Sequence, residues 1–229
     1  MTTHRFFVPA DAMLGDRFPV PSSIERQVRG VLRLRDGARV VLLNGDGMEA
    51  ECVLEGTDCV IVVRRANRAE PTHRLTVAQA LLKGDALEDV IQHGTEVGIA
   101  AFQLVLAERC VAREISDRRL DRLRSIAREA AEQSERGIIP AVDAPVPVAK
   151  VMSSGAVLLH ERAGEDGLAG LDPPATVIIG PEGGWTDAEV ASARAAGVPV
   201  VGLGPRILRS QTVAVAAGAV ILSRAGDFA

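Results

Sequence analysis

The chain of 229 residues is poor in aromatic side chains and has few residues that bind metals. It contains no tyrosine, one tryptophan and three cysteines. The cysteines are odd in number and lack Cys-x-x-Cys spacing, so we expect reduced, mostly buried thiols rather than a disulfide framework or a zinc site. The four histidines are scattered, and no paired carboxylates accompany them, so no metal site is predicted. These residues are Cys52, Cys59, Cys110, His4, His73, His93 and His160.

Long hydrophobic runs are also missing. The longest, Val213 to Leu222, is too short to span a bilayer. The first ten residues lack the apolar core of a signal peptide. We therefore expect a cytoplasmic protein with no membrane partner. Because 47% of the residues are hydrophobic, the chain can bury one good core and a smaller second core.

Lysine is scarce, since only two of the 26 basic residues are lysines. The net charge of −4 argues, taken alone, against a protein that binds nucleic acid, because phosphate contacts supply much of the affinity in such complexes. The arginines are clustered, however, within residues 24–39 and 113–128. The planar guanidinium suits bidentate contacts with phosphates or bases, but such clusters also occur on solvated helix faces with internal ion pairs. Both interpretations of the clusters remain open.

The organisation of the chain changes near residues 69–72. Before this point, apolar runs at residues 38–43 and 60–63 alternate with turns, and Asn44-Gly45 is a strong hairpin signal. Residues 1–70 are therefore predicted to form a small β-rich barrel. After it, strand and helix patterns alternate, which predicts an α/β domain with a mostly parallel sheet over residues 71–229. The expected strands are 75–81, 102–106, 157–160, 177–179 and 200–201, and the expected helices are 85–97, 117–135, 187–196 and 212–222.

Two glycine-rich turns, at residues 180–185 and 202–209, each follow a short apolar run and precede a helix. Thr186 and Glu189 form a capping-box pattern, and Ser210 is the expected cap of the last helix. Either turn alone is compatible with a plain strand-to-helix connection. Together they predict one pocket at the carboxyl ends of parallel strands.

The pocket does not have the pattern of a phosphate-binding loop. Gly184 is followed by Trp185, and neither Gly-Lys-Ser/Thr nor Gly-x-Gly-x-x-Gly is present. The charged residues of the turns are one carboxylate, Glu182, and two guanidinium groups, Arg206 and Arg209. This set suits a zwitterionic or cationic small molecule better than a triphosphate. His160 ends an apolar run and is either a satisfied strand-end histidine or a ligand contact.

Gly180-Pro181-Glu182-Gly183-Gly184 and Leu203-Gly204-x-Arg206-Ile207-Leu208-Arg209 resemble the signature of the 16S rRNA uracil-N3 methyltransferases of the SPOUT superfamily. The resemblance extends to residues 5–8, 82–98 and 129–140. Two features depart from the family pattern. Trp185 stands where phenylalanine is usual, and Ser210-Gln211-Thr212 replaces a more usual Thr-Glu-Thr, so position 211 is not acidic.

The resemblance implies a PUA-like, RNA-binding β-barrel followed by a knotted SPOUT α/β domain with a mostly parallel sheet and flanking helices. It implies S-adenosylmethionine as cofactor and 16S rRNA in the small ribosomal subunit as substrate, methylated at uracil N3. The apolar helix 212–222 has almost no polar face, so we also expect a homodimer. The implied RNA contacts are Arg5, Arg26, Arg29 and Arg33. The implied cofactor contacts are Leu159, His160, Gly180, Glu182, Gly183, Gly184, Leu203, Gly204, Ile207 and Leu208.

Loss of the N3 proton would leave negative charge on uracil O2 and O4, so a cationic donor is wanted near those oxygens. Arg209 is the first candidate for this catalytic role and Arg206 is the second. The sequence identifies no proton acceptor. Two other functions remain open: a knotted enzyme that methylates the ribose 2′-oxygen, and a noncatalytic RNA-binding adaptor.

Overall fold

The computed structural model describes residues 3–163 and 167–228. The chain divides into two compact units. The first contains Met1–Glu70 together with Ala131–Ile139, and the second contains Pro71–Ala130 and Pro140–Ala229. The segment Ala131–Ile139 therefore groups with the first unit, whereas the sequence analysis places it in the second domain.

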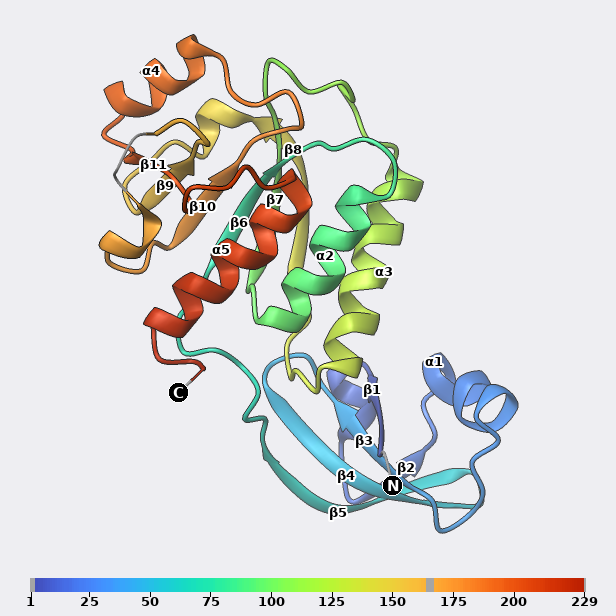
Figure 1. Ribbon diagram of the computed structural model, residues 1–229. Helices are drawn as coiled ribbons and strands as arrows, with labels where there is room; N and C mark the ends of the chain where they lie inside the picture. Colours follow the sequence, from blue (N-terminus) through green and yellow to red (C-terminus); the bar gives the residue numbers. More distant parts are fainter. Residues whose placement is uncertain (1–2, 164–166, 229) are drawn as a thin grey trace. The chain divides into compact units, whose positions relative to one another are not determined.

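The first unit contains a five-stranded sheet with the strand order β1-β3-β4-β5-β2 (Figure 1). β1 pairs with β3 in parallel, and the remaining pairs are antiparallel. The predicted hairpin turn joins β3 to β4, where the Asn44 side-chain oxygen accepts hydrogen bonds from the backbone of Asp46 and Met48. The elements are β1 (His4–Phe7), η1 (Ala10–Met13), β2 (Arg17–Pro19), α1 (Ser22–Glu25), η2 (Arg26–Val31), β3 (Arg39–Leu43), β4 (Met48–Glu55) and β5 (Asp58–Ala66).

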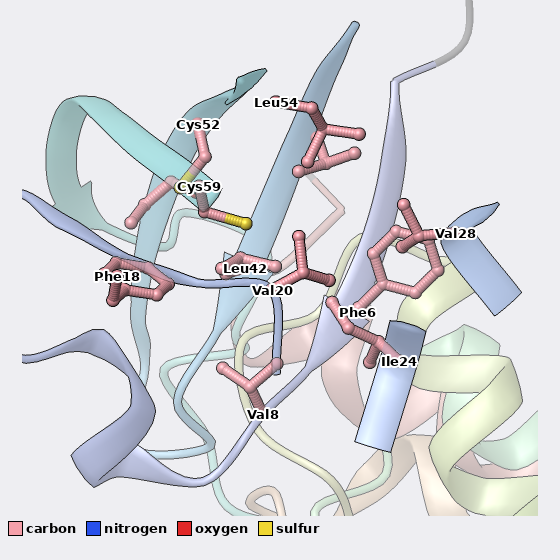
Figure 2. Close-up of a cluster of buried hydrophobic side chains, with 12 residues drawn as sticks. Phe6, Val8, Phe18, Val20, Ile24, Val28, Leu42, Cys52, Leu54 and Cys59 are labelled. Carbon is pink, nitrogen blue, oxygen red and sulfur yellow. Dashed lines mark hydrogen bonds between the residues drawn. The ribbon is translucent and has the colours of Figure 1, made fainter. Parts of the chain in front are cut away.

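Figure 2 shows the core on one face of this sheet. Phe6 and Leu42 come from neighbouring strands, and the helical segment α1–η2 contributes Ile24 and Val28. Cys52 and Cys59 lie in the same cluster as free thiols, and Cys110 is also free and buried in the second unit. The predicted reduced, buried cysteines are confirmed.

The opposite face of β3 is also covered. Successive side chains of a strand point to opposite faces, so Val40 and Leu42 enter the first core while Val41 and Leu43 point away from it. Val41 and Leu43 pack with Phe7 and with Ala131, and Ile139 covers this second cluster. Segment 131–139 thus explains why the β3 run is apolar on both faces.

The second unit is built on a six-stranded sheet with the order β11-β9-β10-β6-β7-β8. All of its described pairings are parallel. The strands are β6 (Thr76–Ala80), β7 (Ala101–Leu106), β8 (Ala141–Pro147), β9 (Ala156–Leu159), β10 (Thr176–Ile179) and β11 (Val200–Val201). The helices are α2 (Ala86–Val97), α3 (Asp117–Gln133), η3 (Val148–Lys150), η4 (Leu168–Gly170), α4 (Asp187–Ala195) and α5 (Ser210–Arg224). The last residues of α3 belong to the first unit.

The sequence analysis did not predict β8. Its sequence contains Pro145 and Pro147, which weaken a strand pattern. β8 lies at the edge of the sheet, where a residue without a backbone N–H is tolerated. Within the described residues, no helix combines the length and apolar character needed to cross a membrane.

The start of α5 differs from the prediction. Arg209, not Ser210, occupies the N-cap position, and its side chain makes no capping hydrogen bond. Ser210 is the first residue of the helix, and its hydroxyl donates to the Gly180 carbonyl at 2.6 Å. The prediction of Ser210 as the cap is therefore wrong, because its hydroxyl is used across the fold rather than within the helix.

Candidate active site

A cavity of about 650 Å³ lies where β9, β10 and β11 lead into their following loops. The two glycine-rich turns form most of its wall, and residues after β6 and the start of α5 complete it. The structure brings together every residue predicted for the pocket: Leu159, His160, Gly180, Glu182, Gly183, Gly184, Leu203, Gly204, Arg206, Ile207, Leu208 and Arg209. All of them belong to the second unit.

Trp185 holds the first turn in place. Its buried indole N–H donates to the Leu159 carbonyl at 2.8 Å, which links the ends of β9 and β10. A Cβ atom on Gly180 would lie 3.0 Å from the indole ring, so glycine favours this close packing. The next helix begins with the predicted capping box, in which Thr186 and Glu189 exchange hydrogen bonds. That prediction is confirmed.

Gly183 packs closely against Arg109. A Cβ atom there would lie 3.1 Å from Cβ of Arg109, whose guanidinium donates to the carbonyls of Gly183 and Trp185, each at 3.1 Å. Gly184 adopts a φ of 68°, which disfavours other residues. At Gly204 a Cβ atom would meet nothing within 4 Å, so the backbone there borders open space in the cavity.

The cavity carries charges of both signs. Glu182 accepts a hydrogen bond from the backbone N–H of Lys83 at 2.9 Å, which ties the glycine turn to the loop after β6. Arg206 and Arg209 are exposed, and neither forms an ion pair with a described residue. Arg209 stands at the N-terminus of α5, where the helix dipole disfavours a cation. Positive potential is therefore concentrated at this side of the cavity.

His160 has one defined hydrogen bond. Its Nδ1 lies 3.1 Å from the backbone nitrogen of Arg162 and accepts that N–H. In the neutral ring the proton is then on Nε2, because one nitrogen donates and the other accepts. His160 is thus set up as a hydrogen-bond donor at Nε2.

The predicted RNA contacts are not all in one place. Arg26 and Arg29 lie on η2 and Arg33 follows it. Arg26 and Arg33 are exposed, and neither forms an ion pair with a described residue. The guanidinium of Arg29 instead donates hydrogen bonds to the carbonyls of Leu34 and Gly56. Arg5 is mostly buried, with ion pairs to Glu49 and Glu135, each at 2.8 Å. Burial raises the pKa of Glu49, but hydrogen bonds from Arg65, Arg5 and Asn67 outweigh this effect and hold the pKa below its usual value.

The residues of the cavity and its supports that were not predicted as part of the site include Lys83, Glu161, Trp185 and Arg109. Lys83 follows β6, so its position at the carboxyl edge of a parallel strand was a usable signal. Glu161 follows His160 in the sequence and approaches Gly184. Nothing in the sequence indicates the contact between Arg109 and Gly183. No cluster of three or more metal-binding side chains occurs among the described residues.

Comparisons with known proteins agree with this geometry. Residues 68–222 match the model of an RNA methyltransferase domain. The chain is 39% identical over 210 residues to the ribosomal RNA small subunit methyltransferase E of Mycobacterium bovis, covering 83% of this chain and 80% of that protein. It is 30% identical to the Bacillus subtilis protein of the same name, with 85% of each chain covered.

A solved structure of the same kind is similar along nearly its full length. The ribosomal RNA small subunit methyltransferase E from Neisseria gonorrhoeae, bound to S-adenosyl methionine, superposes with a TM-score of 0.88 at 28% identity. The match covers 97% of this chain and 98% of the other. With the family model and the relatives in agreement, the chain belongs to the RNA methyltransferase family.

Proposed function

We propose that the protein transfers a methyl group from S-adenosylmethionine to N3 of a uracil in 16S rRNA of the small ribosomal subunit. The relatives' shared name supports small-subunit rRNA as substrate, and the Neisseria structure supports the cofactor. The observation that carries the proposal is the convergence of both glycine-rich turns and the N-terminus of α5 on one cavity.

The residues present fit this cofactor. The cavity volume lies within the range of small-molecule sites, and Gly204 presents backbone to open space. The carboxylates of Glu161 and Glu182 and the guanidinium of Arg206 suit a ligand that has both an amino group and a carboxylate. S-adenosylmethionine supplies a methyl carbon bonded to a sulfonium, open to attack in line by a nucleophile.

The chain's own part in the chemistry is to orient the uracil and stabilise its charge. When N3 loses its proton, negative charge spreads to O2 and O4. Arg209 and the free N–H groups of the first turn of α5 supply positive potential, with Arg206 as a second cation. His160 offers a hydrogen-bond donor through Nε2.

The first unit is proposed to recognise RNA as a PUA-like barrel. Arg26 and Arg33 are the best candidates for phosphate contacts and Arg29 is the next, while the ion pairs of Arg5 favour a structural role. Each lost phosphate contact should flatten the log–log salt dependence of binding by roughly one unit. Unchanged slopes for Arg26→Ala and Arg33→Ala would contradict the assignment.

Three further properties belong to the same proposal. The second unit threads as a trefoil knot, the enzyme works as a homodimer, and it acts in the cytoplasm where ribosomal subunits are found. The homodimer is supported by α5, on which Val213, Val215 and Val220 stay half-buried although the helix is apolar. Covering such a face requires another apolar surface.

Calorimetric titration with S-adenosylmethionine distinguishes the proposed enzyme from a noncatalytic RNA-binding adaptor. The proposal predicts one binding event for each chain, accompanied by a change in fluorescence of Trp185, the sole tryptophan, which lines the cavity. A protein that binds small-subunit RNA but gives neither signal would be an adaptor. The ribose alternative is decided by which nucleoside of the small-subunit RNA carries the new methyl group.

A further inference from the structure

Gln79 is a fully buried polar residue in the middle of β6, at 0% exposure. Its side-chain Nε2 donates to Oγ of Ser210 at 2.9 Å and to the Ala80 carbonyl at 3.1 Å. Both amide hydrogens are therefore used. Ser210 lies 131 positions away in the sequence, at the first residue of α5.

The hydrogen bonds run in a defined direction. Since Oγ of Ser210 accepts from the amide of Gln79, its own hydrogen is free to donate, and it points to the Gly180 carbonyl at 2.6 Å. This relay joins β6, the start of α5 and the first residue of the glycine turn. Ser210 and Gly180 line the cavity, whereas Gln79 lies behind them.

Gln79 is a costly choice for stability alone. Its Oε1 is buried and has no hydrogen-bond partner among the described residues. Leaving a buried acceptor unpaired is destabilising, and an apolar side chain of similar size would avoid that penalty. Buried polar atoms without a hydrogen-bond partner are more often found at sites where function requires them.

We propose that Gln79 is a positioning residue of the cofactor site: through Ser210, it fixes the Gly180 carbonyl and the first turn of α5 so that the two loops enclose one cavity. The inference rests on the proposed cofactor site. Arg209 directly precedes Ser210, so the same relay also holds the backbone that carries the proposed catalytic guanidinium. Loss of the relay should therefore lower both cofactor affinity and turnover.

Gln79→Leu and Ser210→Ala remove the two ends of the relay, and each should raise the Kd for S-adenosylmethionine by at least about 10-fold. The double variant should lose little more than either single variant, because both break the same chain of bonds. Ser210→Thr keeps the hydroxyl and should recover most of the affinity. Thermal unfolding of Gln79→Leu should stay at or above the wild-type midpoint, since the unpaired acceptor is removed.

Gln103→Leu is the matched control. Gln103 lies on the neighbouring strand β7, and its Nε2 likewise donates to two backbone carbonyls, Leu104 and Ala144, but it does not line the cavity. This variant should bind the cofactor as the wild type does. Wild-type affinity in Gln79→Leu, additive losses in the double variant, or no recovery in Ser210→Thr would overturn the proposal.

Acrylamide quenching of Trp185 tests the relay without any ligand, because the indole packs on Gly180. Quenching should increase in Gln79→Leu and Ser210→Ala and stay unchanged in Gln103→Leu. Unchanged quenching in all three variants would overturn the positioning role. If the wild type bound no S-adenosylmethionine while quenching followed the expected pattern, the proposed function would fail and the relay would stand.

Discussion

Arg209 is the residue on which the proposed chemistry depends most. Arg209→Ala should slow methyl transfer roughly 100- to 1000-fold, by analogy with removing an oxyanion donor worth about 3 to 4 kcal/mol. Cofactor affinity should remain nearly constant, because backbone groups form most of the cavity wall. Raising the pH should partly restore the rate, since alkali removes the N3 proton without help.

Single-turnover methylation of small subunits across pH, together with calorimetry, measures both quantities. Arg194→Ala is the control, because Arg194 is an exposed arginine of α4 outside the cavity. A wild-type rate in Arg209→Ala would rule out the role, as would a parallel loss of rate and cofactor binding.

For single residues, the sequence predicted which ones lie in the cavity better than it predicted which partners they contact. Gly183 lines the cavity, but its close contact with Arg109, which lies 74 residues earlier, was not predicted. Ser210 was expected to cap α5, but its hydroxyl donates to the Gly180 carbonyl. Both contacts were missed for one reason: strand ends can be inferred from local pattern, whereas the partner of a side chain depends on tertiary packing.

Among the elements, a single carboxylate makes several of the hydrogen bonds that tie segment 131–139 to the rest of the first unit. Glu70 accepts hydrogen bonds from Arg136 and from the backbone N–H groups of Gly137 and Ile138, each at 2.9 Å. Arg136 is almost fully buried, at 2% exposure. Glu70→Ala removes the carboxylate that pairs with the buried guanidinium of Arg136. It should lower the free energy of unfolding by about 3 kcal/mol.

Urea unfolding measures this effect. Glu55→Ala is the control, because it breaks an exposed ion pair with Arg17 in the same unit and should cost less than about 1 kcal/mol. Equal losses in the two variants would contradict the role assigned to Glu70.

The thiols of β4 and β5 should make the fold sensitive to alkali. Burial raises the pKa of Cys52 to about 12 and that of Cys59 to about 11, from a usual value of 9.0. The two thiols ionise at a lower pH in the unfolded chain than in the folded chain. The stability that burying the neutral thiols provides is therefore complete below pH 9 and is lost as the pH rises toward 12. At pH 11 the loss should reach about 2 kcal/mol for each thiol.

The chain has no tyrosine and only two lysines, so few other groups titrate in this window. Urea unfolding at pH 8 and about pH 11 should therefore show a drop in stability that Cys52→Val with Cys59→Val largely removes. A drop of the same size in the double variant would exclude the thiols as its cause.

The elements themselves were largely predictable. Strict alternation of strand and helix predicted the parallel sheet, and the Asn44-Gly45 turn predicted the β3–β4 hairpin. β8 was missed because prolines obscure an edge strand. The grouping of segment 131–139 with the first unit could not be inferred, because it depends on contacts between residues more than 60 positions apart, such as Glu70 and Arg136.

For the whole molecule, the proposed homodimer predicts light scattering at twice 24.1 kDa. Val215→Asp should give a monomer, because it puts a charge on the half-buried face of α5. Val62→Asp is the control, since Val62 is 55% exposed on β5. A clean wild-type monomer at micromolar concentration would contradict the dimer and any active site shared between two chains.

Mass spectrometry of nucleosides from small-subunit rRNA tests the proposed N3 methylation. Subunits from a strain that lacks this protein are incubated with purified enzyme and S-adenosylmethionine carrying a labelled methyl group. The proposed N3 methylation predicts labelled N3-methyluridine with the wild type and far less of it with Arg209→Ala. Label on a ribose 2′-oxygen, or no labelled nucleoside despite cofactor binding, would contradict it.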